Sequence, residues 1–153
     1  MGQRQSLILG IFGLIPFVLL ISASLISPPD EVIYELIIFI YVSYAAVISS
    51  FLGGIQWGLI TASAEKIYST FLPLFITTLP CLIAWGALLT LKNLTISLSL
   101  IIISFLVSSI YDYYLYQQKL TPYWFLRVRI PLSIVVIILT FVLFFFNPQM
   151  MSL

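Results

Sequence analysis

Charged side chains are so sparse that they divide this chain into long uncharged runs. The runs span residues 5–29, 36–64, 67–91, 93–111 and 130–153, and the shortest has 19 residues. A helix needs about 20 apolar residues to cross the apolar part of a bilayer, because each residue advances it by about 1.5 Å. Only 7% of the 153 residues are charged, against about 25% in a soluble domain. The pattern indicates an integral membrane protein and excludes a soluble enzyme.

We predict a single all-α transmembrane domain over residues 1–153, built as a bundle of five helices. The helices are expected near 6–26, 33–61, 70–91, 94–117 and 130–147. Prolines and polar turns separate these segments, as at Pro28-Pro29 and Lys92-Asn93. Pro131 is expected in the first turn of the last helix, where its missing N–H has no helical partner to lose.

The basic residues fall mainly on one side of such a bundle. If the helices alternate in direction, one side holds five of the six basic residues and the other holds Lys92. Cytoplasmic loops of membrane proteins carry an excess of lysine and arginine. We therefore expect a cytoplasmic N-terminus and a periplasmic C-terminus. The cytoplasmic set is Arg4, Lys66, Lys119, Arg127 and Arg129.

The residue inventory limits the chemistry that this chain can perform. It contains no histidine and one cysteine, Cys81, so a histidine-based metal site and a Ser-His-Asp triad are excluded. The net charge of +1 gives no basic surface for nucleic acid. We predict no catalytic residue, no metal and no cofactor.

The second predicted helix carries small residues at intervals of four, with one further glycine beside them. Such residues allow membrane helices to approach closely. We expect this stripe to pack against the protein's own helices, and a homodimer contact is the alternative. The packing residues are Ala46, Ser50, Gly53, Gly54, Gly58 and Ala62.

Polar and aromatic residues of three predicted helices meet in the cytoplasmic leaflet. Gln56 needs a hydrogen-bonding partner inside the membrane, and it serves either as structural glue or as a ligand contact. Asp112 is either functional or a member of an ion pair with Arg127 or Arg129. Residues 122–129 are basic and aromatic, which predicts an interfacial segment along the membrane surface. The candidate ligand-binding residues are Gln56, Trp57, Asp112, Trp124, Arg127 and Arg129.

Two segments resemble the signature sequences of domain-of-unknown-function family 3429, which includes the mitochondrial transmembrane protein 69. They are residues 50–58, with the sequence SFLGGIQWG, and residues 122–132, with the sequence PYWFLRVRIPL. The family pattern often has a histidine where this chain has Gln56, which weakens a catalytic interpretation of this position. No transit peptide precedes the first helix, so the resemblance implies a multi-pass protein of a bacterial inner membrane.

Three functional hypotheses are compatible with these features. The first is a non-enzymatic accessory or assembly partner of a larger membrane complex, because the loops are short and no catalytic set is present. The second is a lipid- or quinone-binding protein with a pocket in the cytoplasmic leaflet, walled by Gln56 and Trp57. The third is a small transporter that acts as an oligomer. The expected partners are the lipid bilayer, other membrane proteins or a second copy of the chain, and a bound lipid or quinone.

Overall fold

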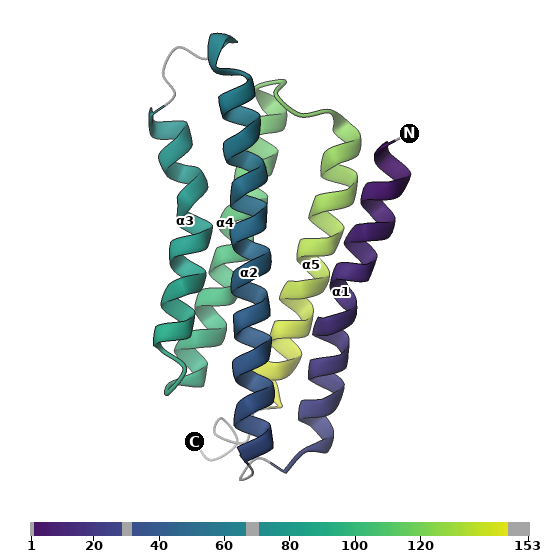
Figure 1. Cartoon of the computed structure of the whole chain (residues 1–153), viewed down its shortest axis with the longest axis vertical. Helices are drawn as coiled ribbons and strands as arrows, with labels where there is room; N and C mark the ends of the chain where they lie inside the picture. Colours follow the sequence, from purple (N-terminus) through teal and green to yellow (C-terminus); the bar gives the residue numbers. More distant parts are fainter. Residues whose placement is uncertain (1, 29–31, 67–70, 147–153) are drawn as a thin grey trace.

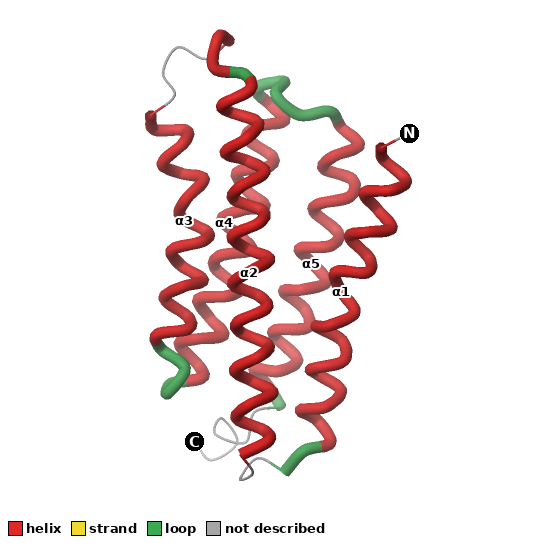
Figure 2. Tube along the Cα trace, in the orientation of Figure 1, coloured by secondary structure: helices red, strands yellow, loops and turns green. Residues whose placement is uncertain are grey.

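The protein is a bundle of five long helices, seen in a computed structural model that describes residues 2–28, 32–66 and 71–146 (Figures 1 and 2). Each of the five helices is long and apolar enough to cross a membrane. The five predicted spans are therefore confirmed. The elements are α1 (Gly2–Ile26), α2 (Val32–Ala62), the short 3-10 helix η1 (Ala64–Lys66), α3 (Phe71–Leu89), α4 (Leu94–Gln117) and α5 (Tyr123–Phe145).

The helices run in alternating directions, so α1 begins and α5 ends at opposite ends of the bundle (Figure 1). We call the end where α1 begins the upper end. It also holds η1 and the connection from α4 to α5. The long helix α2 packs against α1, α3 and α4, while α5 packs against α1 and α4. This arrangement brings the upper halves of α1, α2 and α5 around a common space.

The ends of α4 show how the local sequence sets the helix limits. Asn93 caps the start, and its side-chain oxygen accepts a hydrogen bond from the Ile96 N–H over 3.2 Å. At the other end Lys119 adopts a left-handed backbone conformation with φ of 57°. Such a residue commonly terminates a helix, because it turns the chain away while the last carbonyls remain hydrogen-bonded. Here the Leu120 N–H donates to the Leu115 carbonyl over 3.0 Å.

The start of α5 differs from the prediction. Residues 122–129 were expected as a separate interfacial segment before a helix at 130, but α5 is continuous from Tyr123 and has Pro131 in its interior. The physical reason is that a helix satisfies the backbone groups of this segment inside the membrane. It also directs Leu126 and Arg129 into the bundle, where both are buried. The first helix likewise begins earlier than expected, at Gly2.

Side-chain hydroxyl groups connect the helices across the otherwise apolar core. The hydroxyl oxygens of Ser49 in α2 and Ser104 in α4 lie within hydrogen-bonding distance of each other and of the Pro80 carbonyl of α3, which is 3.1 Å from Ser49 and 2.7 Å from Ser104. The two hydroxyl protons are shared among these three oxygens. Tyr41 of α2 and Thr140 of α5 share a hydrogen bond of 2.8 Å. Polar contacts of this kind help membrane helices to associate, since lipid provides no hydrophobic drive between them.

Candidate functional site

The most polar part of the membrane-spanning interior is a chain of three side chains from three helices. The amide nitrogen of Gln56 in α2 donates to Oδ1 of Asp112 in α4 over 2.8 Å. The other carboxylate oxygen, Oδ2, accepts a hydrogen bond from Nε of Arg129 in α5 over 3.0 Å. Gln56 and Asp112 are 0% and 1% exposed, and Arg129 is 7% exposed. We call this set the polar network.

The polar network balances its own charge inside the bundle. A buried carboxylate is costly unless a cation and hydrogen-bond donors surround it, and Asp112 has both. The amide nitrogen of Gln56 also donates to the Ser108 carbonyl over 2.9 Å, which fixes the side chain against α4. Of the two arginines considered for the ion pair, Arg129 therefore forms it. Because three helices contribute, the polar network also sets the rotation of each helix about its axis.

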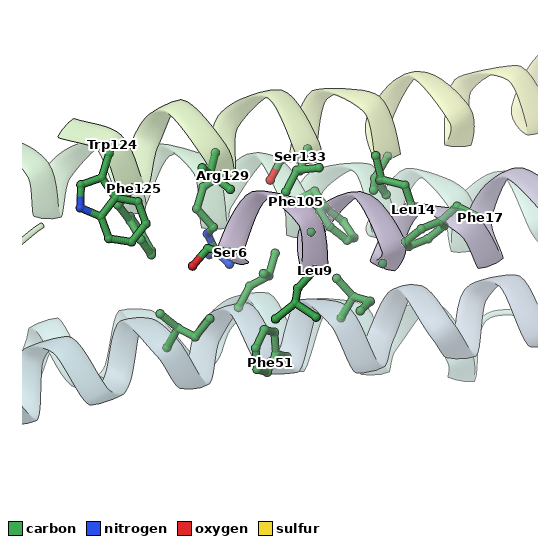
Figure 3. Close-up of a pocket in the computed structure, with 18 residues that line it drawn as sticks. Ser6, Leu9, Leu14, Phe17, Phe51, Phe105, Trp124, Phe125, Arg129 and Ser133 are labelled. Carbon is green, nitrogen blue, oxygen red and sulfur yellow. The ribbon is translucent and has the colours of Figure 1, made fainter. Parts of the chain in front are cut away.

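A pocket of about 450 Å³ lies beside the polar network, in the upper half of the bundle (Figure 3). Its walls come from Ser6–Phe17 of α1, Ile48–Ile55 of α2 and Trp124–Val136 of α5, and Phe105 of α4 closes one side. Figure 3 shows Trp124, Phe125 and Arg129 at one end of this space and Phe17 at the other. Among the described residues that line the pocket, Arg129 is the charged one.

The predicted ligand-binding residues separate into three groups. Trp124 and Arg129 line the pocket, while Gln56 and Asp112 lie behind Arg129 in the polar network. Trp57 is 45% exposed on the outer surface of α2 and is not among the pocket residues. The prediction that Gln56 and Trp57 form one wall is therefore wrong, because neighbouring helical residues point about 100° apart.

Arg127 is also outside the pocket. It is exposed, and its guanidinium carbon lies 4.8 Å from the centre of the Tyr123 ring. The two arginines are two residues apart on a helix, so they face different directions. One of them is buried in the polar network, and the other remains at the surface of the bundle.

The predicted packing stripe on α2 is only partly buried. Ala46 and Gly53 lie inside, and a Cβ atom added to Gly53 would lie 2.5 Å from the Thr77 carbonyl oxygen of α3. The prediction that the whole stripe packs within the protein is wrong. Residues spaced by four drift about 40° per step around a helix of 3.6 residues per turn, so the stripe rotates out of the bundle. Its exposed members are Ser50, Gly54, Gly58 and Ala62.

The contribution of α1 was not predicted from the sequence. Ser6, Gly10 and Gly13 line the pocket, and a Cβ atom on Gly10 would lie 2.4 Å from the side chain of Leu132 in α5. The available signal was the pair of glycines three residues apart, which places both on one side of a helix. Gly10 thus lets α1 approach α5 closely, which closes the pocket on this side.

These features define the class of the protein: a multi-pass membrane protein with a charge-balanced polar network beside an interhelical pocket. The chain belongs to the family described as Protein of unknown function (DUF3429), whose model matches residues 2–145. The predicted family is thereby confirmed.

The chain is also similar to a transmembrane protein of a vertebrate. The chain is 35% identical over 136 residues to Transmembrane protein 69 of Xenopus tropicalis, and this match covers 89% of the chain and 52% of that protein. The chain therefore spans about half the length of this relative. No solved structure matches the chain.

Proposed function

We propose that this five-helix unit is a non-enzymatic protein that holds an amphipathic membrane molecule, a lipid or a quinone, in the pocket between α1, α2 and α5. The observation that carries this proposal is an apolar pocket with a buried arginine at one end. Its volume of about 450 Å³ falls within the range of about 300–1,000 Å³ that is usual for small-molecule sites. The acid of the polar network is engaged by Gln56 and Arg129, which favours binding over acid–base chemistry.

The charge distribution supports an orientation for the bundle. The upper end contains the start of α1, η1 and the α4–α5 connection, where the basic residues concentrate (Figure 1). By the positive-inside rule, we infer that this end faces the cytoplasm and that α5 ends on the periplasmic side of a bacterial inner membrane. The pocket would then open in the cytoplasmic leaflet.

Native mass spectrometry after purification in a mild detergent tests the binding function. The parent protein should carry an added mass of one lipid or quinone, and Gly13→Ile should lose it. Gly13 lines the pocket, and a Cβ atom added there meets nothing within 4 Å, so the larger side chain has room to occupy the space. Gly54→Ile is the matched control, because Gly54 is equally unobstructed but faces outward. An added mass that is equal in all three proteins would contradict the proposal.

A second proposed role, as an accessory or assembly partner of a larger membrane complex, is favoured by the outer surface of α2. Its small residues Ser50, Gly54, Gly58 and Ala62 are exposed, and a Cβ atom added to Gly54 or Gly58 meets nothing within 4 Å. The Ser50 hydroxyl, at the start of this row, donates to Sγ of Cys81 in α3 over 3.2 Å. Small residues in a row permit close packing with another membrane helix. This surface is suited to a second copy of the chain or to another membrane protein.

Gly13→Ile and Gly54→Ile also test the second role, with the opposite expectation for each variant. Gly54→Ile should abolish recovery of a stoichiometric partner in a tagged pull-down from gentle detergent, whereas Gly13→Ile should retain it. Isolation of the parent protein as a lone monomer under these conditions would contradict an assembly role. Because the two substitutions introduce the same side chain, the comparison separates the pocket from the outer surface.

A further inference from the structure

The deeper part of the pocket contains a hydroxyl group without a hydrogen-bonding partner. Ser133 of α5 lines the pocket and is 5% exposed, and its hydroxyl makes no hydrogen bond with the described residues. A buried hydroxyl without a partner is costly and is rare in a folded protein. The other buried serines of the described chain all have a partner, and they are Ser24, Ser49, Ser97, Ser104 and Ser108.

The Ser133 hydroxyl is directed into the pocket and not back to its own helix. A helical serine can donate to the carbonyl four residues before it, as Ser22 and Ser50 do here over 2.9 and 2.8 Å. Ser133 makes no such bond, and its oxygen retains accessible surface, unlike the enclosed and unpaired oxygens of Ser109 and Thr121. Because Ser133 as a whole is buried, the space that its oxygen reaches is the pocket.

Ser133 lies in an uncharged part of the pocket. Arg129 is one helical turn earlier in α5, about 6 Å nearer the upper end, and Asp112 balances its charge. Figure 3 shows Trp124 and Arg129 toward one end of the space, with Ser133 further along in the direction of Phe17. The other described residues of the wall are uncharged. An ionised group beside Ser133 would therefore be buried without a counter-charge, which is costly.

An uncharged oxygen on an apolar molecule fits this position better than water does. A buried water needs about two to four polar partners, whereas the neighbours of Ser133 in the pocket wall of α5, Leu132 and Val136, are apolar. A carbonyl oxygen accepts the hydroxyl proton and adds no donor of its own, while a second hydroxyl group would bring another donor that needs a partner. The partner that suits Ser133 is thus a carbonyl oxygen.

We propose that Ser133 is a ligand-binding residue, whose hydroxyl donates a hydrogen bond to an uncharged carbonyl oxygen of a membrane molecule. The ester groups of glycerolipids and the rings of quinones both supply such an oxygen. The assignment rests on the proposed binding function and specifies the polar contact of its ligand. The hydrocarbon part of the ligand lies toward Leu14 and Phe17, where the wall is apolar.

Titration with three single-chain probes, followed by native mass spectrometry in mild detergent, tests this contact. Methyl oleate carries an ester carbonyl, oleyl methyl ether has the same chain without the carbonyl, and oleate carries a carboxylate. The parent protein should bind methyl oleate about two- to tenfold more tightly than the ether, as expected for one neutral hydrogen bond. It should bind oleate more weakly than methyl oleate, and tighter binding of oleate would overturn the uncharged group.

Ser133→Ala provides the matching change on the protein side. It should lower the affinity for methyl oleate by the same factor and leave the affinity for the ether unchanged. An equal loss for both probes, or for neither, would overturn the hydrogen bond. If the variant does not fold, the comparison of ester and ether in the parent protein still decides the result, because equal affinities there would also overturn it.

Ser109→Ala is the matched control, because it removes another unpaired hydroxyl that is not in the pocket wall. This variant should bind methyl oleate like the parent. Unfolding in SDS separates binding from a structural role. Since the Ser133 hydroxyl has no partner in the described chain, Ser133→Ala should unfold at no lower SDS concentration than Ser109→Ala. A clearly lower midpoint would show that Ser133 holds the bundle together and would overturn the proposal.

Competition against bound methyl oleate distinguishes the two sources of the carbonyl. Dioleoylglycerol or decylubiquinone should displace it, and the competitor that acts at the lower concentration identifies the class. If neither does so, the assignment to a lipid or quinone carbonyl is overturned. If Gly13→Ile abolishes methyl oleate binding while Ser133→Ala retains it in full, the pocket stands and the Ser133 contact falls. If Gly13→Ile binds methyl oleate like the parent, the pocket itself falls.

Discussion

Replacing Arg129 by methionine should strongly destabilise the bundle, because it leaves the Asp112 carboxylate buried without a cation. Asp112 is 1% exposed and would lose both 3.0 Å approaches from the guanidinium, keeping only the amide of Gln56 on its other oxygen. Breaking a buried ion pair from one side costs about 3–5 kcal/mol. The expected loss of unfolding free energy for Arg129→Met is in this range.

A double-mutant cycle separates the cost of the unpaired charge from the loss of packing. Asp112→Asn/Arg129→Met removes both charges, and the asparagine can still accept the hydrogen bond from Gln56. Replacing a buried ion pair by neutral groups of similar volume is often close to energetically neutral, so the double variant should recover most of the loss. The coupling energy between the two positions should therefore exceed about 2 kcal/mol.

Unfolding by added SDS in mild-detergent micelles, followed by tryptophan fluorescence, measures these free energies. Arg127→Met is the control, because it removes an exposed arginine from the same helix and should change the midpoint little. Unfolding of Arg129→Met within about 1 kcal/mol of the parent, a loss well below that for breaking a buried pair, would contradict this expectation. A double variant that is less stable than Arg129→Met alone would contradict it as well.

Three other changes test separate parts of the structure. Gly53→Ala should have a free energy of unfolding about 1–3 kcal/mol lower than that of Gly54→Ala, and so a lower SDS midpoint. A Cβ atom at Gly53 would lie 2.5 Å from a carbonyl oxygen of α3, whereas one at Gly54 meets nothing within 4 Å. Equal midpoints would contradict this close approach. Ser104→Ala removes a hydroxyl of α4 that hydrogen-bonds with groups of α2 and α3. The same assay should show a free energy of unfolding lower by about 0.6 kcal/mol. A gain in stability would contradict this expectation. Trp124→Leu should reduce the ligand mass retained in native mass spectrometry, whereas Trp57→Leu should not, because only the former lines the pocket; equal retention would place the ligand elsewhere.

The polar network was predictable to a considerable extent. Only a few charged residues lie near the membrane interior, and the alternation of spans puts Asp112, Arg127 and Arg129 in one leaflet with Gln56. A charged side chain in this environment needs a partner of opposite charge. The sequence therefore limited the ion-pair partner of Asp112 to one of the two arginines, Arg127 or Arg129. The choice between them depended on the start of α5, because the rotation of that helix determines which arginine faces inward.

The pocket and the packing surface of α2 were not predictable in the same way. Every face of these helices is apolar, so hydrophobicity does not distinguish a side chain in the bundle from one in lipid. In α1, Leu9 is 69% exposed and Phe17 is 1% exposed, although both are large and apolar. The glycines of α2 show the same ambiguity, since Gly53 contacts α3 while its neighbour Gly54 faces outward.

The membrane class, the number of spans and the gathering of polar residues toward one end of the bundle follow from the amino-acid sequence. They do so because the bilayer acts on each helix separately, through the length of its apolar run and the cost of every charge. The tertiary structure alone decided which arginine pairs with Asp112, which small residues are buried, and that α1 closes a pocket against α5. These features depend on the rotation and position of whole helices relative to one another, which arise from many weak contacts summed over the bundle.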